Sequence, residues 1–209
     1  MVKEKEMRSK SLKARTIITV LSAIGLLFIS IIAPITVLAE DNVSVSTVSA
    51  LQQAVDQAED NQTIVLSDDF VFSDAAINMP DKNVVIDGRG LIWSMGTFTV
   101  SGNGNGSLTI KDFKFDGNNI AGTCLTNKTG NGTLLIDHTE IFNASTGAIG
   151  IAATGNAKTV ISYTKIYNNE SNNIGAAINI SGNNTTPIEI NNATIENNTG
   201  NGAGYECGA

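Results

Sequence analysis

Apolar residues recur in the second half of the chain at intervals of about 25 residues. Five isoleucines serve as anchors, with spacings of 24, 26, 25 and 29: Ile86, Ile110, Ile136, Ile161 and Ile190. Two positions before the anchors lie Val84, Leu108, Leu134, Thr159 and Ile188. Five positions after them lie Leu91, Phe115, Ile141, Ile166 and Ile195. Fourteen of these fifteen positions are apolar, Thr159 being the exception. A repeat of this period predicts a solenoid.

Each repeat reads as three short strands. The anchor and the residue two before it share one face of a strand. Polar residues follow the anchor directly, and the next apolar position that all five repeats share comes five positions later, out of phase with the alternation of the strand. This change of phase predicts a corner. Further apolar patches lie at 98–100, 124–125, 148–151 and 177–180. Strand-forming residues dominate, and Asn and Gly flank them, which argues against helical repeats. We therefore expect an all-β, right-handed parallel β-helix of about five rungs over 81–209.

Asparagines align at the second corner of the repeat. Asn143, Asn168 and Asn197 follow their anchors by seven positions, and three further asparagines occupy the next position: Asn118, Asn169 and Asn198. Asparagine tolerates the left-handed backbone region, and stacked asparagines can hydrogen-bond along a stack. The alignment favours a structural ladder at Asn143, Asn168 and Asn197 over asparagines that merely fill turns.

Residues 40–80 follow a different pattern. Apolar residues at 51, 54, 55 and 58 are spaced as on one face of a helix. Ser49 and Gln52 fit a capping box at its start. Residues 63–66 then read as a strand. Because the end of a solenoid exposes apolar surface, we interpret 40–80 as a cap that includes a first, incomplete rung.

The first 39 residues are typical of an export signal. A basic segment, 1–16, precedes an apolar run over 17–33, then Pro34 and the triplet Val37-Leu38-Ala39. This order predicts a signal peptide cleaved after Ala39. The alternative is an uncleaved anchor, because 17–39 is long enough to span a bilayer. The long basic segment is typical of Gram-positive bacteria, so we expect a secreted or cell-surface product that meets the membrane only through its signal peptide during export.

Charge and composition narrow the partners. Residues 40–209 contain 7 basic and 18 acidic residues, a net charge of −11, which argues against nucleic acid and anionic membranes as partners. Cys124 and Cys207 fall about three coils apart, roughly 14 Å at the strand spacing, and this exceeds the reach of a disulfide. His138 is the only histidine, and no Cys/His cluster has ligand spacing. We expect no metal site and no cofactor.

Three segments carry a resemblance to a known group. They are 45–55, 62–66 and Asn83-Val84-Val85-Ile86-Asp87-Gly88-Arg89-Gly90. Together they resemble the opening of right-handed parallel β-helix proteins of the pectate-lyase-like group, with the closest likeness to adhesive domains of Gram-positive surface proteins. The segments 141–143 and 175–178 also resemble, in degenerate form, the repeats of polymorphic outer-membrane proteins. The resemblance covers 43–209. It implies the fold but specifies the function poorly, because proteins with this solenoid include lyases, hydrolases and adhesins.

Catalysis is the alternative that the resemblance raises. Leu135-Ile136-Asp137-His138 is similar to the Trp-Ile-Asp-His stretch of pectate lyases, but other repeats also place polar residues at this corner. The resemblance implies calcium-binding carboxylates with an arginine base and a lysine. Arg89 is the only arginine after residue 39, and it lies three rungs' worth of sequence from any accompanying cluster of basic residues. Hydrolases of this fold need paired carboxylates on neighbouring rungs, whereas Asp68-Asp69 lies in the cap. We expect no catalytic residues, a polysaccharide lyase or hydrolase being the alternative.

The binding candidates are charged and aromatic residues of the outer surface. Lys114, Glu140 and Lys165 should stack on one outer face, and Tyr163 and Tyr167 are aromatic candidates on the surface of one rung, whereas Trp93, near a turn, is expected to be a packing residue. The predicted function is adhesin-like binding of carbohydrate or of a matrix or cell-surface ligand; a structural spacer in a larger surface protein is a further alternative. Residues 202–209 read as the lead into another strand, so we expect a chain truncated from a longer surface protein.

Overall fold

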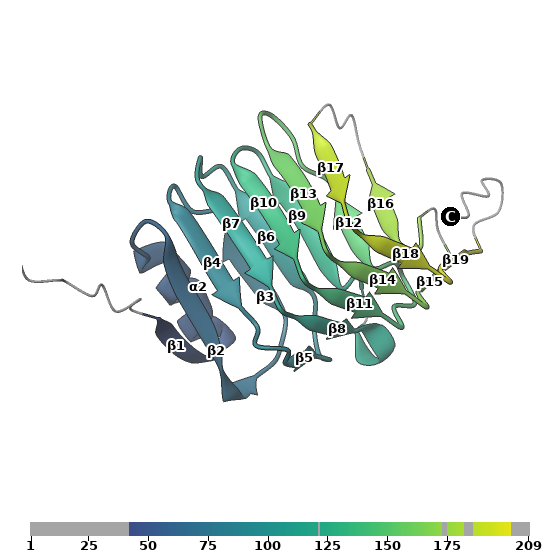
Figure 1. The fold of residues 1–209 in the computed structure, drawn as a ribbon, viewed down its shortest axis with the longest axis horizontal. Helices are drawn as coiled ribbons and strands as arrows, with labels where there is room; N and C mark the ends of the chain where they lie inside the picture. Colours follow the sequence, from purple (N-terminus) through teal and green to yellow (C-terminus); the bar gives the residue numbers. More distant parts are fainter. Residues whose placement is uncertain (1–41, 121, 173–174, 182–185, 202–209) are drawn as a thin grey trace, which may run out of the picture. The chain divides into compact units, whose positions relative to one another are not determined.

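The computed structural model describes residues 42–120, 122–172, 175–181 and 186–201. They form a parallel β-solenoid of about 6 turns, as the repeat predicted (Figure 1). The expected signal peptide, its cleavage at Ala39, the anchor alternative, Cys207 and the segment 202–209 lie outside the described residues. Within the described ranges, every helix is too short or too polar to cross a bilayer.

Three parallel sheets form the sides of the solenoid. Sheet A has the order β1-β2-β4-β7-β10-β13-β17: Val43–Thr47, Gln62–Val71, Asn83–Asp87, Ser107–Lys111, Thr133–Asp137, Lys158–Ser162 and Ile188–Asn191. Sheet B has the order β3-β6-β9-β12-β16: Ala75–Asn78, Phe98–Gly102, Leu125–Thr129, Ile149–Ile151 and Ile178–Ile180. Sheet C has the order β5-β8-β11-β14-β18: Ile92–Trp93, Lys114–Asp116, Glu140–Phe142, Lys165–Tyr167 and Thr194–Glu196. β15 (Glu170–Ser171) pairs with β19 (Thr199–Gly200).

The isoleucine anchors stack in register, which confirms the repeat. Each anchor pairs with the next along sheet A, from Ile86 through Ile110, Ile136 and Ile161 to Ile190. Ile64 of β2 pairs with Ile86 and extends the stack by one coil. Gln62–Asn78 therefore belongs to the solenoid, which explains why it has about 6 turns rather than five.

One position in the predicted register is wrong. Trp93, not Leu91, pairs with Phe115, and Ile92 pairs with Lys114. The corner between β4 and β5 is longer, and two residues there have left-handed backbone: Arg89 at φ 52° and Gly90 at φ 75°. The extra length moves Trp93 into the core.

The core of the early coils is aromatic. Trp93 is fully buried, as expected, and its Nε1 donates to the carbonyl of Gly96 at 3.1 Å. Five phenylalanine rings lie within 6.2 Å of its ring, centroid to centroid: Phe70, Phe72, Phe98, Phe113 and Phe115. Later coils replace these rings with isoleucine and alanine, so the core changes from aromatic to aliphatic along the axis.

A short helix lies beside the first coil. α2 (Val48–Gln57) buries Leu51 and Val55 against the core, at the end of the solenoid where β1 and β2 lie. The predicted capping box is wrong, because Thr47 is the N-cap and its hydroxyl accepts from Ala50 N at 3.2 Å. The Gln52 side chain instead donates to Asp56 at 2.6 Å and accepts from the backbone N of Asn78 at 3.0 Å. Gln52 thus helps to fix the helix on β3.

Both corners use left-handed residues. At the first corner, between sheets A and C, the φ angles of Asp112, His138, Tyr163 and Asn192 lie between 45° and 55°. At the second corner, Asn143, Asn168 and Asn197 have φ between 55° and 58°. Asparagine and aspartate adopt this region at the lowest cost among residues with a Cβ. The repeated corner geometry explains the alignment of polar residues in the sequence.

The hydrogen-bonded asparagine column lies one residue beyond the predicted ladder. Asn169 is buried; its Nδ2 donates to Asn198 Oδ1 at 2.8 Å and to the carbonyl of Ile141 at 3.1 Å. Its Oδ1 accepts from Ala144 N at 2.9 Å. In the predicted column, Asn143 donates to Asp116 at 3.2 Å. The predicted column supplies the turn conformation and, at Asn143, one side-chain bond between coils, whereas the buried Asn169 bonds to the backbone and to an asparagine of the neighbouring coils.

Candidate functional site

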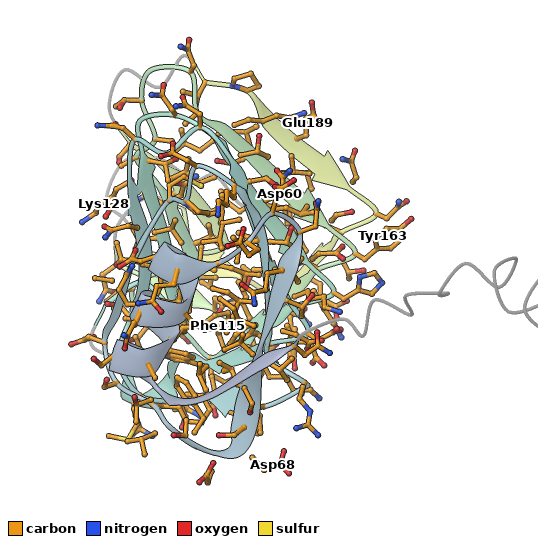
Figure 2. The ribbon with its side chains drawn as sticks, turned by 90° about the vertical axis from the view of Figure 1, so that its left-hand side faces the viewer. Asp60, Asp68, Phe115, Lys128, Tyr163 and Glu189 are labelled. Carbon is orange, nitrogen blue, oxygen red and sulfur yellow. The ribbon has the colours of Figure 1, made fainter. Side chains whose placement is uncertain are left out.

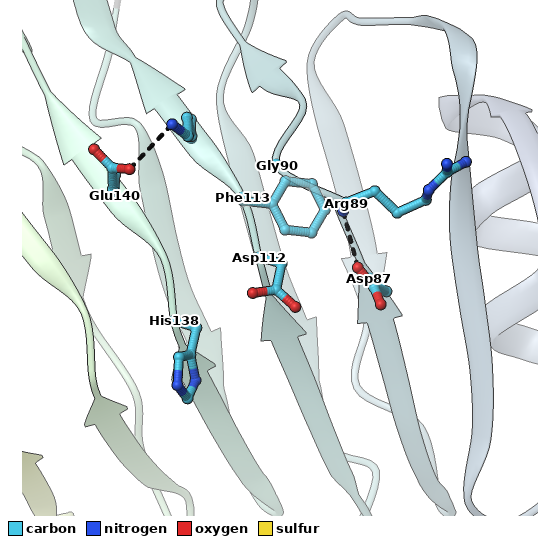
Figure 3. A pocket seen from close by; sticks show the side chains of 8 residues that line it. Asp87, Arg89, Gly90, Asp112, Phe113, His138 and Glu140 are labelled. Carbon is cyan, nitrogen blue, oxygen red and sulfur yellow. Dashed lines mark hydrogen bonds and ion pairs between the residues drawn. The ribbon is translucent and has the colours of Figure 1, made fainter.

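A polar groove runs along the first corner of the solenoid. Its lining comes from three successive coils: Asp87, Arg89 and Gly90, then Asp112, Phe113 and Lys114, then His138 and Glu140 (Figure 3). Its volume is about 430 Å³. Because the three coils are consecutive in sheets A and C, the groove crosses the strands and follows the solenoid axis.

The backbone at this corner sets the groove's shape. Asp112 and His138 occupy left-handed positions directly after β7 and β10, which turns their side chains outward. Gly88 passes so close to the Phe113 ring that a Cβ there would lie 2.6 Å from Cγ. Thr139 Oγ1 donates to the carbonyl of Asp137 at 2.9 Å and braces the turn. The groove is thus held by the same turn that shapes each coil.

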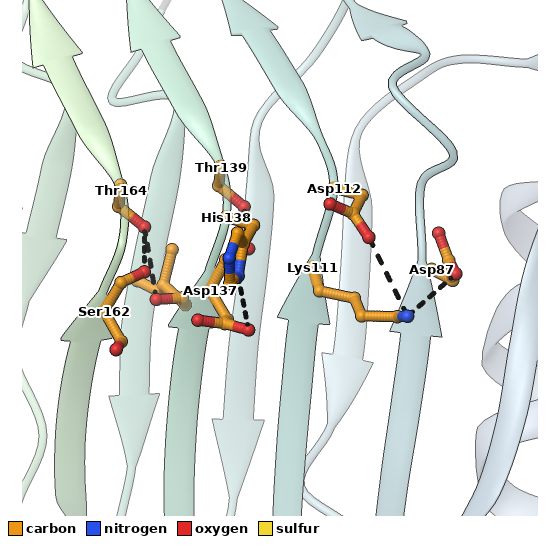
Figure 4. Close-up of polar contacts among 9 residues, drawn as sticks. Asp87, Lys111, Asp112, Asp137, His138, Thr139, Ser162 and Thr164 are labelled. Carbon is orange, nitrogen blue, oxygen red and sulfur yellow. Dashed lines mark hydrogen bonds and ion pairs between the residues drawn. The ribbon is translucent and has the colours of Figure 1, made fainter.

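Lys111 neutralises one wall of the groove. Its Nζ lies 3.1 Å from Asp87 Oδ2 and 3.7 Å from Asp112 Oδ2 (Figure 4). The hydrogen bond to Asp87 is the main cause that raises the pKa of Lys111 above its ordinary value, with smaller contributions from both carboxylate charges and an opposing one from burial. Sequence reasoning had not selected Asp87, Lys111 or Asp112 as a site. The sequence does place acidic and basic residues alternately at this corner of successive repeats. Only the register of the coils shows that these residues lie close together.

The other cations around the groove are paired too. Lys114 Nζ lies 3.2 Å from Glu140 Oε1 across two coils. Arg89 pairs with Asp68 of β2 at 3.2 Å, and its guanidinium points away from Glu140 and His138. Arg89 and Lys114 therefore line the same groove, although the Arg89 guanidinium is turned toward β2 of the first coil.

His138 and Tyr163 extend the groove with a stacked pair. The two rings lie 4.9 Å apart at 19°, and His138 Nδ1 lies 2.9 Å from Asp137 Oδ2. Tyr163 is 56% exposed. Viewed from the α2 end, Tyr163 lies on the opposite side of the solenoid from Lys128, with Phe115 inside (Figure 2). Asp137-His138 thus forms part of an exposed corner surface.

Lys114, Glu140 and Lys165 stack in register on sheet C, as predicted. Their side chains do not form one continuous set of ion pairs, because Lys114 contacts Glu140 whereas Lys165 contacts Glu196. Glu140 pairs with both lysines in the backbone ladder. Lys165 Nζ, however, contacts Glu196 of the next coil at 2.9 Å, while Tyr167 donates its hydroxyl hydrogen to Glu140 at 3.1 Å. These contacts form a continuous network on the outer face, and it adjoins the groove at Lys114 and Glu140.

Tyr167 does not offer a free ring face. Phe142 stacks on it with centroids 5.3 Å apart and planes at 14°. Lys165 Nζ lies 4.4 Å from the Tyr167 centroid and contacts Glu196, whose coil lies on the side of Tyr167 away from the coil of Phe142. A sugar ring would have to displace one of these partners to stack on Tyr167. Of the two predicted tyrosines, only Tyr163 lies beside the groove with its side chain largely exposed.

The groove can recognise a ligand through hydrogen bonds. Carboxylate oxygens of Asp112 and Glu140 accept, Lys114 donates, and the imidazole of His138 can do either. Among the described residues, no three Asp, Glu, His or Cys side chains are grouped so that they could hold a metal ion. The arrangement suits a hydroxyl-rich ligand that lies across several coils.

Comparison of the chain with protein-family models, with curated proteins and with solved structures gives no match. The assignment of the fold to the parallel β-solenoids therefore rests on the strand register and the sheet order alone.

Proposed function

We propose that this chain is an exported, cell-surface protein of adhesin type whose corner groove binds carbohydrate chains without cleaving them. One observation carries the proposal: three consecutive coils present hydrogen-bonding side chains in a single groove of about 430 Å³. That volume lies within the usual range for small-ligand sites. Because each coil repeats the corner, the groove matches a linear polymer better than a compact ligand.

Two further features support this proposal. The first 39 residues have the order of an export signal, and carbohydrate is abundant outside cells. The quoted segments between 45 and 90 resemble adhesive domains of the pectate-lyase-like group, whose fold is a parallel β-helix. Because binding proteins and enzymes share this fold, the fold alone does not indicate the function, and the proposal depends mainly on the groove.

Binding to a panel of neutral and acidic oligosaccharides, measured by calorimetry, tests the proposal. The informative variant is His138→Asn, because asparagine tolerates the left-handed corner while the imidazole is lost. Lys128→Ala is the matched control, since Lys128 is exposed on sheet B, on the other side of the solenoid. We expect His138→Asn to weaken binding at least about tenfold, the loss of a strong polar contact, and Lys128→Ala to leave it unchanged.

The other outcomes distinguish the alternatives. Shortened oligosaccharide products, detected by mass spectrometry after incubation, would overturn the proposal of binding without cleavage and would favour a polysaccharide lyase or hydrolase. Absence of binding across the panel would favour a structural spacer. Binding that His138→Asn leaves unchanged would show that the binding surface lies elsewhere, and equal losses in both variants would show an effect that is not specific to the groove.

A further inference from the structure

The charges around the groove point to its ligand class. We infer that the groove selects uncharged glycan chains over chains of uronic acids, an inference that rests on the proposed function. It concerns the same groove of three coils and predicts which of two closely matched polysaccharides binds. The argument depends on how the cations of the groove are paired, and on the balance of charge that surrounds them.

First, the cations at the groove already have carboxylate partners. Lys111 lies between Asp87 and Asp112, Lys114 contacts Glu140, and the Arg89 guanidinium contacts Asp68. A uronate carboxylate that approached one of these cations would have to share it with the protein carboxylate already in contact. Two negative charges would then adjoin one cation, and their mutual repulsion offsets much of the new attraction. A cation that is already paired therefore provides little net attraction for a uronate.

Second, acidic groups are in excess at the groove. With the ion-pair partners of its lining included, the groove has four carboxylates, from Asp68, Asp87, Asp112 and Glu140, against three cations, from Arg89, Lys111 and Lys114. Asp137, beside His138, adds a further carboxylate at the rim. Residues 40–209 together have a net charge of −11. The field of the protein therefore repels an approaching polyanion, over a distance of about 10 Å at moderate salt.

Third, the same groups suit sugar hydroxyls. A hydroxyl can donate to Asp112 or Glu140 and accept from Lys114 without breaking either ion pair, because each carboxylate oxygen accepts more than one hydrogen bond. The ion pairs hold these side chains in place before the ligand arrives, which lowers the entropy cost of binding. A neutral chain therefore finds donors and acceptors without an electrostatic penalty.

The test compares oligomers that differ only in charge. Each pair consists of a uronic acid oligosaccharide and its carboxyl-reduced form, of the same length and linkage, and calorimetry gives both affinities. We expect the reduced form to bind at least about tenfold more tightly, because like charges juxtaposed at an interface are costly. Raising the salt concentration should strengthen binding of the acidic form by screening the repulsion and should leave the reduced form nearly unaffected.

A variant ties this selectivity to the groove. Asp112→Asn removes one carboxylate and retains a residue suited to φ 55°. We expect it to lower the preference for the reduced form at least about threefold, since a nearby like charge is removed. Glu170→Gln is the control: it removes the same charge from β15, which is exposed and does not line the groove, and should leave the preference unchanged.

The outcomes separate the two proposals. Tighter binding of the acidic form, weakened by salt, would overturn the preference for neutral chains and leave the carbohydrate-binding function intact. Binding of neither form in any pair, together with no binding of neutral oligosaccharides, would overturn the proposed function itself. An equal effect of Asp112→Asn and Glu170→Gln would mean that net charge, rather than the groove, sets the preference, and would also overturn the inference.

Discussion

Asn127 and Thr159 are joined by a hydrogen bond across the core of the solenoid. Asn127 Nδ2, on sheet B, donates to Thr159 Oγ1, on sheet A, at 2.8 Å, and both residues are fully buried. Asn127 Oδ1 accepts from the backbone N and the hydroxyl of Thr129, at 3.0 and 2.9 Å. Thr159 was the one polar residue among the fifteen repeat positions. Its partner on the opposite sheet accounts for that exception.

Thr159→Val should therefore destabilise the protein although it makes the core more apolar. The substitution leaves an amide N–H of Asn127 without its acceptor, at a cost of about 1–3 kcal/mol. Urea unfolding measures the change in free energy of unfolding. Thr159→Ser keeps the hydroxyl and is the control; we expect a smaller loss, about 1 kcal/mol, from the missing methyl group. A Thr159→Val protein more stable than the wild type would contradict this account.

Asn168 and Asn169 are adjacent but have different roles, and glycine substitutions should separate them. Asn168 supplies a left-handed turn at φ 55°, which glycine adopts readily, so Asn168→Gly should cost no more than about 1 kcal/mol. Asn169→Gly strands Ala144 N and the carbonyl of Ile141 in buried surroundings, so we expect a loss of at least about 2 kcal/mol. Thermal and urea unfolding of the two variants give the comparison. Similar losses would assign both asparagines to the turn alone.

The sequence predicted the solenoid because every coil repeats the same inward pattern. Side chains that stack along the axis must all fill the same kind of apolar space. The same apolar spacing therefore recurs in the sequence wherever successive coils have the same length. The prediction failed at Leu91, because two additional corner residues shift Trp93 into its place. It also placed the helix cap at Ser49 rather than Thr47, since both hydroxyls precede the apolar face and only the backbone conformation distinguishes them.

The candidate site was less accessible to sequence reasoning. Lys114, Glu140 and Lys165 could be aligned from the repeat, but side-chain rotamers decide that Lys165 contacts Glu196 and that Phe142 and Lys165 both contact the ring of Tyr167. The groove combines residues from sheets A and C through their shared corner. Its residues lie up to 53 positions apart, from Asp87 to Glu140, and no local motif connects them.

Cys124 should be inert while the protein is folded. It is a free, fully buried thiol, and burial, assisted by the charge of Asp116, raises its pKa from 9.0 to about 12. That shift lowers the thiolate fraction at pH 8 about a thousandfold, and only the thiolate reacts. In a Cys207→Ser protein, which isolates Cys124, Ellman's reagent should react slowly in buffer and rapidly in denaturant. Rapid reaction in buffer would show that Cys124 is accessible.

Tyr167 should ionise at higher pH than a free tyrosine. Burial is the main cause that raises its pKa above 10.0; the hydrogen bond to Glu140 and the charge of that carboxylate add to the effect, while Lys165 opposes it. The folded protein therefore holds the phenolic proton more tightly than the unfolded chain. The resulting stability is fully present below pH of about 10 and is lost as the pH rises through the pKa of the folded state.

The ultraviolet absorbance of phenolate gives this titration. Subtracting the curve of Tyr167→Phe from that of the wild type isolates Tyr167 from the other two tyrosines of the chain. Glu140→Gln should lower the midpoint, because it removes the carboxylate charge and replaces the accepting oxygen with an uncharged amide. It should not bring the midpoint to that of a free tyrosine, since burial, the largest cause, persists. A midpoint that Glu140→Gln leaves unchanged would mean that the contact between Tyr167 and Glu140 does not form in solution, and would remove the link between the outer network and the groove.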